Sequence, residues 1–161
     1  MKIKFITTGG TIDKVYFDAL SEYQVGPPQV LDVLKEGHVA FEFEVESILQ
    51  KDSLDLTEAD RQLIRHRIAA DACERIVVTH GTDTMVATAQ ALEGIAGKTI
   101  VLTGSLQPAR FRNTDAIFNI GTAIGAVQSL PPGVYLAMNG RVFHPRRVRK
   151  NRAQQTFEEI A

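Results

Sequence analysis

Two short stretches of the sequence place hydroxyl side chains directly after a glycine turn. The first is TTGGTI at residues 7–12, and the second is THGTDT at residues 79–84. Each follows an apolar run that is typical of a buried strand. If both strands belong to one parallel sheet, the hydroxyls of Thr11 and Thr82 emerge at the same edge, where α/β sheets bind their ligands. The pattern predicts a site with two threonines and a nearby Asp.

Helix capping is the simpler explanation for some of these polar residues. Thr82, Asp83 or Thr84 could cap the following helix, because a side-chain oxygen at that position accepts a hydrogen bond from a free backbone N–H. Capping accounts for one of the residues and leaves the others unexplained. We expect His80 to be an internal hydrogen-bonding residue that makes the turn rigid.

A threonine hydroxyl is a weak nucleophile, so it needs a base or a neighbour that relays its proton. Three partners are available in the sequence. Tyr23 could act on Thr11. Lys150 could act on Thr82 if its ammonium group is desolvated. Asp83 could orient Lys150 or hold an ammonium group of a substrate.

Together, the two threonine stretches resemble the signature motifs of the bacterial-type L-asparaginase family, which are amidohydrolases with a threonine nucleophile. The resemblance continues through GSLQP at residues 104–108 and from Met138-Asn139 to Lys150, and so covers nearly the whole chain. It implies the N-terminal domain of that family, as one domain over residues 1–161, without the C-terminal domain.

The resemblance also implies a role for each site residue. Thr11 would be the primary nucleophile, assisted by Tyr23. Thr82, Asp83 and Lys150 would form a second catalytic group. Asp83 would also fix the α-amino group of the substrate, and Ser53 would help to hold its α-carboxylate. The residues implied for substrate binding are Gly10, Asp52, Ser53, Gly81, Thr82, Asp83 and Ser105. Backbone N–H groups of the glycine turns would supply the oxyanion donors.

The sequence departs from the family pattern near the expected substrate. Leu54 stands where members often have a polar residue, and Ser105-Leu106 replaces a more usual Ala-Met-Arg type of sequence. These departures predict changes in how the carboxylate and the carboxamide are recognised. In typical members, the C-terminal domain of a neighbouring protomer contributes an acidic residue to the site. Glu158 or Glu159 of a partner's tail could take its place.

Residues 9–26 show almost no periodicity, although they lie beside Thr11 in the sequence. A loop of this length in a compact domain is usually functional or disordered. We predict a mobile lid over the active site. Tyr16 and Tyr23 both lie in this segment, and surface packing is the ordinary explanation for either one. The resemblance of residues 21–26 to the family favours Tyr23 as the lid tyrosine, with Tyr16 as its competitor.

The rest of the chain alternates between strand and helix patterns. Strands are expected at 2–8, 39–49, 75–79, 98–103 and 134–138, and helices from Pro27 or Pro28 to about 36, from Thr57, and over 84–94 and 113–128. This alternation predicts an α/β fold with a mainly parallel sheet and helices on both faces. Asn139-Gly140 predicts a hairpin turn, so residues 139–161 are expected to form a hairpin and a basic, locally charge-balanced tail.

Composition narrows the possible partners. The net charge is −1, from 18 basic and 19 acidic residues, which gives no general attraction to nucleic acid or to an anionic membrane. Cys73 is the single cysteine, so no intrachain disulfide forms, and we expect it to be a small buried residue. The four histidines lack the spacing of metal ligands. We expect no metal and no cofactor, and, without a secretory signal or a membrane-spanning run, a cytoplasmic protein.

The family resemblance implies hydrolysis of L-asparagine to L-aspartate and ammonia through a threonyl ester, in a homo-oligomer with two-fold symmetry. Two alternatives remain open. One is a catalytically weak amino-acid-binding protein that keeps Asp83 and Ser53. The other is an amidase that acts as part of a complex or on another amide such as L-glutamine, since one methylene changes discrimination by only about 1–3 kcal/mol.

Overall fold

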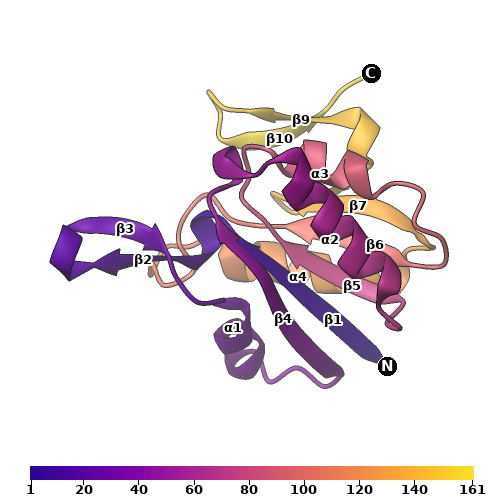
Figure 1. Ribbon diagram of the computed structural model, residues 1–161, viewed down its shortest axis with the longest axis horizontal. Helices are drawn as coiled ribbons and strands as arrows, with labels where there is room; N and C mark the ends of the chain where they lie inside the picture. Colours follow the sequence, from indigo (N-terminus) through magenta and orange to yellow (C-terminus); the bar gives the residue numbers. More distant parts are fainter.

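The computed structural model describes residues 1–161 and has a six-stranded sheet at its centre (Figure 1). In spatial order, its strands are β4 (Glu42–Lys51), β1 (Lys2–Gly9), β5 (Arg75–Thr79), β6 (Thr99–Thr103), β7 (Gly133–Met138) and β8 (Arg141–Phe143). The first five strands are parallel, and β8 pairs antiparallel with β7 through the Asn139-Gly140 turn. The predicted mainly parallel sheet and the predicted hairpin turn are therefore confirmed.

Helices cover both faces of the sheet, as predicted. α2 (Glu58–Ala70) and α3 (Met85–Leu92) pack on one face, and α1 (Val30–Glu36) and α4 (Ala116–Ser129) pack on the other. Within β5, Ile76 and Val78 belong to the core between the sheet and α2 and α3. Val77 belongs to the core on the opposite face, under α1 and α4. A strand with a buried residue on each face has a continuous apolar sequence. None of the helices is long and apolar enough to cross a membrane.

Local capping chemistry fixes the start of α2, whereas the other three helices begin without a side-chain capping hydrogen bond. Thr57 begins α2 with a capping box, in which its hydroxyl accepts from the Asp60 N–H and the Asp60 carboxylate accepts from the Thr57 N–H. α1 begins at Val30, after both prolines, so the expected start at Pro27 or Pro28 is wrong. α4 begins at Ala116 rather than at residue 113.

Residues 9–26 are not an irregular loop, and that expectation is wrong. Two short strands, β2 (Lys14–Phe17) and β3 (Glu22–Val25), form an antiparallel hairpin that projects from the body of the molecule (Figure 1). Tyr16 lies opposite Tyr23 in this hairpin. The Gly26 N–H donates to the Asp13 carbonyl at 2.8 Å and closes its base. The mobility of this segment stays a prediction.

The basic tail folds into a second small hairpin. β9 (Val148–Asn151) pairs antiparallel with β10 (Thr156–Glu159), and the pair lies at the top of Figure 1, above α3. Arg149 forms an ion pair with Glu158 at 2.6 Å, and Arg141 forms one with Glu159 at 3.1 Å. The expected charge-balanced surface is confirmed.

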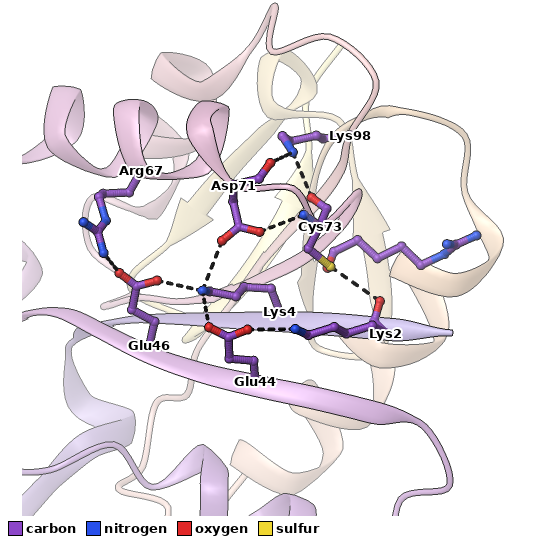
Figure 2. A network of polar contacts seen from close by, with 9 residues as sticks. Lys2, Lys4, Glu44, Glu46, Arg67, Asp71, Cys73 and Lys98 are labelled. Atoms are coloured by element: carbon purple, nitrogen blue, oxygen red, sulfur yellow. Dashed lines mark hydrogen bonds and ion pairs between the residues drawn. The ribbon is translucent and has the colours of Figure 1, made fainter.

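A network of charged side chains lies at the amino end of β1, away from the glycine turns (Figure 2). The Lys4 side chain is only 6% exposed, and its ammonium group contacts Glu44, Glu46 and Asp71 at 2.7, 2.8 and 3.1 Å. Cys73 lies beside this network and is partly exposed, so the expectation of a buried cysteine is wrong. The network joins β1, β4 and the end of α2, and so stabilises the fold.

Candidate active site

The site lies where the direction of the chain through the sheet reverses. β1 and β5 are neighbours, with Thr7 opposite Thr79 near their carboxyl ends. The chain leaves β1 toward β4 on one side and leaves β5 toward β6 on the other. The two loops therefore diverge, and such a crevice is the usual ligand site of an open α/β sheet.

The two glycine turns meet in this crevice. Gly10 has a φ of +92°, and a Cβ added there would lie 2.5 Å from both the Cα and the N atom of Gly81. Real Cβ atoms do not approach other atoms so closely, so both positions require glycine. Because each turn leads directly into a threonine, this contact places Thr11 and Thr82 on the same cavity.

His80 makes the second turn rigid, as predicted. Its ring is fully buried, with Nδ1 2.7 Å from the Gly81 carbonyl and Nε2 2.8 Å from the Thr88 hydroxyl. A carbonyl only accepts, so Nδ1 donates and Nε2 accepts from Thr88. Burial lowers the pKa of His80 to about 4, so the ring is neutral at pH 7.

The capping explanation for this stretch is wrong. Thr84 occupies the N-cap position of α3, but its side chain makes no capping hydrogen bond. Its hydroxyl instead donates to the Ser53 carbonyl at 2.8 Å. Thr84 thus ties the second glycine turn to the segment that follows β4.

A cavity of about 300 Å³ opens beside the glycine turns. Lys150 reaches it from β9, and its ammonium group donates to the Thr82 hydroxyl at 2.7 Å and to the Asp83 carboxylate at 2.9 Å. The Lys150 side chain is 15% exposed, so most of it is removed from water. The residues that line the cavity are Thr11, Thr82, Asp83, Leu106, Lys150, Arg152 and Gln155. The structure thus brings together four of the five residues that the sequence suggested for catalysis.

Ser53 and Asp52 lie beside the second glycine turn and do not line the cavity. Ser53 is buried, and a Cβ added to Gly81 would lie 2.6 Å from the Ser53 Cβ. Asp52 accepts from the Leu54 N–H at 3.1 Å and forms an ion pair with Lys14 of β2 at 2.9 Å. This ion pair connects the projecting hairpin to the site.

Ser105 is also outside the cavity. Its hydroxyl is buried and donates to the Gln107 carbonyl at 2.5 Å, whereas the next residue, Leu106, lines the cavity wall. The carboxylate of Asp115 fixes this turn by accepting from the N–H groups of Leu106 and Gln107 at 3.0 Å.

The structure does not bring Tyr23 to Thr11. The Tyr23 side chain is half exposed, and its ring lies 5.4 Å from the ring of Tyr16 and 5.5 Å from that of Phe111. Neither tyrosine lines the cavity. In this conformation the hairpin therefore leaves the cavity without an aromatic side chain.

Asp13 is the carboxylate nearest to Thr11 in the sequence, and it supports the hairpin rather than the cavity. It is buried and accepts from the Gln29 N–H at 2.9 Å. Burial raises its pKa to about 7. Both its carbonyl and its side chain hold the chain that returns from β3.

Arg152 and Gln155 are cavity residues that the sequence analysis missed. The sequence places Arg152 in a solvated basic tail, yet its Nε lies 3.4 Å from the Asp83 carboxylate. The available signal was its position two residues after Lys150 in the same basic segment. In β9, the side chains of Arg149 and Asn151 contact Glu158 instead.

Comparison with known proteins agrees with this geometry. The family model described as Asparaginase, N-terminal, matches residues 2–160, so the chain belongs to the asparaginase family over its N-terminal domain. It is 32% identical over 162 residues to an L-asparaginase of Thermococcus kodakarensis, covering 93% of this chain and 48% of that protein. The solved structure of the thermostable L-asparaginase from that organism superimposes with a TM-score of 0.85, over 99% of this chain and 51% of that one.

Other relatives differ in their reactions. A glutaminase-asparaginase of Acinetobacter glutaminasificans is 31% identical over 169 residues, which are 92% of this chain and 49% of that protein. One component of a glutamyl-tRNA(Gln) amidotransferase, from Methanococcus vannielii, is 29% identical over 157 residues, which are 87% of this chain and 34% of that protein. The chain thus spans about half the length, or less, of these relatives.

Proposed function

We propose that this chain hydrolyses the side-chain amide of a small amino acid, with L-asparagine as the first candidate, and that Thr11 is the nucleophile. One observation carries the proposal. Thr11 and Thr82 line one cavity with Lys150, whose side chain is mostly buried and whose ammonium group donates to both Thr82 and Asp83. Membership of the asparaginase family supports the same reaction.

The reaction proceeds in two steps. The Thr11 oxygen attacks the amide carbon, and its proton passes to the leaving nitrogen. Ammonia then departs, and the acyl group remains bonded to Thr11 as an ester. Water then attacks the ester, which releases the carboxylic acid and restores the Thr11 hydroxyl. Thr82 and Lys150 form a hydrogen-bonded pair through which a proton can move. Backbone N–H groups of the glycine turns are the candidate donors to the oxyanion.

Asp83 is the candidate acceptor for the α-ammonium group of the substrate, because it is the one carboxylate that lines the cavity. Ser53, which packs against Gly81 beside the cavity, is the candidate for holding the α-carboxylate. Tyr23 would assist Thr11 only if the β2–β3 hairpin moved over the cavity. We also propose that the protein is cytoplasmic and forms a homo-oligomer, and analytical sedimentation would test the second of these proposals.

Two other functions are the alternatives to this proposal. The chain would be a weakly catalytic amino-acid-binding protein if it bound L-aspartate without releasing ammonia from amides. It would act on another amide, or within a complex, if it preferred L-glutamine or larger amides or required a partner chain. The similarity to an amidotransferase component favours this second alternative over the first.

The direct test is ammonia release from L-asparagine and L-glutamine by the wild type and by Thr11→Ala, Thr82→Ala and Lys150→Ala. We expect each variant to lose roughly 100-fold or more in kcat/KM. Thr122→Ala is the matched control, because Thr122 is a partly exposed residue of α4 that lies outside the cavity and its hydroxyl donates to the Phe118 carbonyl. No ammonia from the wild type with either amide would refute the proposal for these substrates, and calorimetry with L-aspartate would then detect a binding protein.

A further inference from the structure

Two positive groups and one negative group line the cavity. Lys150 and Arg152 both contact the same oxygen of Asp83, at 2.9 Å from Nζ and 3.4 Å from Nε. The cavity therefore carries one more positive than negative charge when it is empty. A ligand that brings a carboxylate corrects this imbalance.

The two positive groups are held very differently. The Lys150 side chain is 15% exposed and has a second hydrogen bond, to the Thr82 hydroxyl. The Arg152 side chain is 71% exposed, and Asp83 is its one ion-pair partner. Lys150 is thus fixed by two contacts, whereas Arg152 can leave Asp83 at little cost.

A substrate with an α-ammonium group competes directly with Arg152 for Asp83. Once the ammonium group has bound there, the guanidinium group is left at the cavity mouth without its partner. The α-carboxylate of an amino acid is bonded to the same carbon as its ammonium group, so it reaches the cavity wall next to Asp83. A guanidinium group binds a carboxylate through two parallel hydrogen bonds, which a single ammonium group cannot make.

We propose that Arg152 is a specificity-determining residue that leaves Asp83 when substrate binds and pairs with the substrate's carboxylate. This inference rests on the amide hydrolysis proposed above, and it names the preferred substrates as amides that carry a carboxylate. The competing explanation is that Arg152 only neutralises Asp83 in the empty site. In that case, its removal would strengthen the binding of every substrate with an ammonium group.

Three amides separate the two explanations when they are given to the wild type and to Arg152→Gln. L-Asparagine carries both the ammonium group and the carboxylate, succinamate lacks the ammonium group, and L-aspartic diamide lacks the carboxylate. If Arg152 pairs with the carboxylate, the ratio of kcat/KM for L-asparagine to that for the diamide falls about fivefold in the variant, as expected for a partly exposed ion pair. The kcat/KM for succinamate itself also falls about fivefold in the variant, whereas it stays unchanged if Arg152 only neutralises Asp83.

Arg149→Gln is the matched control. It removes the same charge from the same hairpin, at a residue that points to Glu158 on the opposite face of β9. We expect its substrate ratios to change less than about twofold. If the ratio of kcat/KM for L-asparagine to that for the diamide did not change in Arg152→Gln, the proposal would be overturned. An increase in kcat/KM for L-asparagine and the diamide without one for succinamate would also overturn it.

Ligand binding tests the pairing separately from turnover. If the wild type released no ammonia from any amide, the proposed hydrolysis would fail, and calorimetry with L-aspartate and succinate would still test Arg152. The proposal predicts that both ligands bind about fivefold more weakly to Arg152→Gln than to the wild type. Equal affinities, or no binding to the wild type, would overturn it.

Discussion

Gly10→Ala tests whether the contact between the two glycine turns builds the site. Gly10 has a φ of +92° and a ψ of −176°, a conformation that residues other than glycine rarely adopt. An added methyl group would also lie 2.5 Å from two backbone atoms of Gly81. The methyl group cannot be accommodated unless one of the two turns moves, because both neighbours are backbone atoms.

The cost follows from these two effects. A residue forced into this region of φ and ψ costs about 1–3 kcal/mol, and an overpacked contact adds about 1–3 kcal/mol. We therefore expect Gly10→Ala to lower the free energy of unfolding by about 4 kcal/mol. Gly97→Ala is the control, because Gly97 has a φ of +71° with no atom within 4 Å of an added Cβ. It should cost only about 1 kcal/mol.

Urea unfolding measures both variants by linear extrapolation. Ammonia release from L-asparagine should fall much more in Gly10→Ala than in Gly97→Ala, because a displaced turn separates Thr11 from Thr82. The reasoning is refuted if the free energies of unfolding of the two variants differ by less than about 0.5 kcal/mol and their rates of ammonia release are the same.

Three further variants test other parts of the fold. Lys4→Ala should lower the free energy of unfolding by about 3 kcal/mol or more, since it leaves three carboxylates facing each other. Lys2→Ala, at an exposed residue that pairs with Glu44, should lower it much less, and equal losses in the two variants would contradict this reasoning. Asp13→Asn should be more stable than the wild type by roughly 2–4 kcal/mol at pH 8 and no more stable at pH 4. The pKa of Asp13 is raised to about 7, so its ionisation opposes folding as the pH rises. A gain in the free energy of unfolding in urea at both pH values would contradict this. Phe111→Ala removes a ring contact to Tyr23 worth about 1 kcal/mol, so amide hydrogen exchange in β2 and β3 should speed up, and unchanged exchange would show that the contact does not hold the hairpin.

The sheet could be predicted from the sequence because its central strands are buried on both faces. The last four residues of β5, from Ile76 to Thr79, are apolar or hydroxyl-bearing, and all of them are fully buried. A continuous run of this kind is typical of a central strand in a parallel sheet. Lys150 was found 68 residues away from Thr82 because its segment resembles a family pattern, and the structure joins the two side chains.

The hairpin of residues 14–25 could not be predicted in the same way. Its two strands have four residues each and bury little, so no apolar alternation marks them. The pairing of Tyr16 with Tyr23 across the strands, and of Tyr23 with Phe111, stabilises it instead. Such contacts join residues whose proximity no local pattern indicates.

The sequence also did not indicate which individual side chains point into the cavity. Leu106 takes the place at the cavity that was expected for Ser105, because Asp115, just before α4, fixes the turn that carries them. Arg152 lies in the turn that joins β9 to β10, directly after the strand that carries Lys150, and it reaches the cavity from there. The side-chain direction therefore depends on a distant residue in the first case and on the position of a turn in the second.

Trapping of the ester is the most direct test of the proposed two-threonine site. The wild type would be mixed with L-asparagine, quenched in acid within one turnover, digested, and mapped by mass spectrometry. We predict an aspartyl ester on the peptide that contains Thr11, and its absence from Thr11→Ala. An ester on Thr82 instead, or full turnover by Thr11→Ala, would contradict the assignment of Thr11 as the nucleophile.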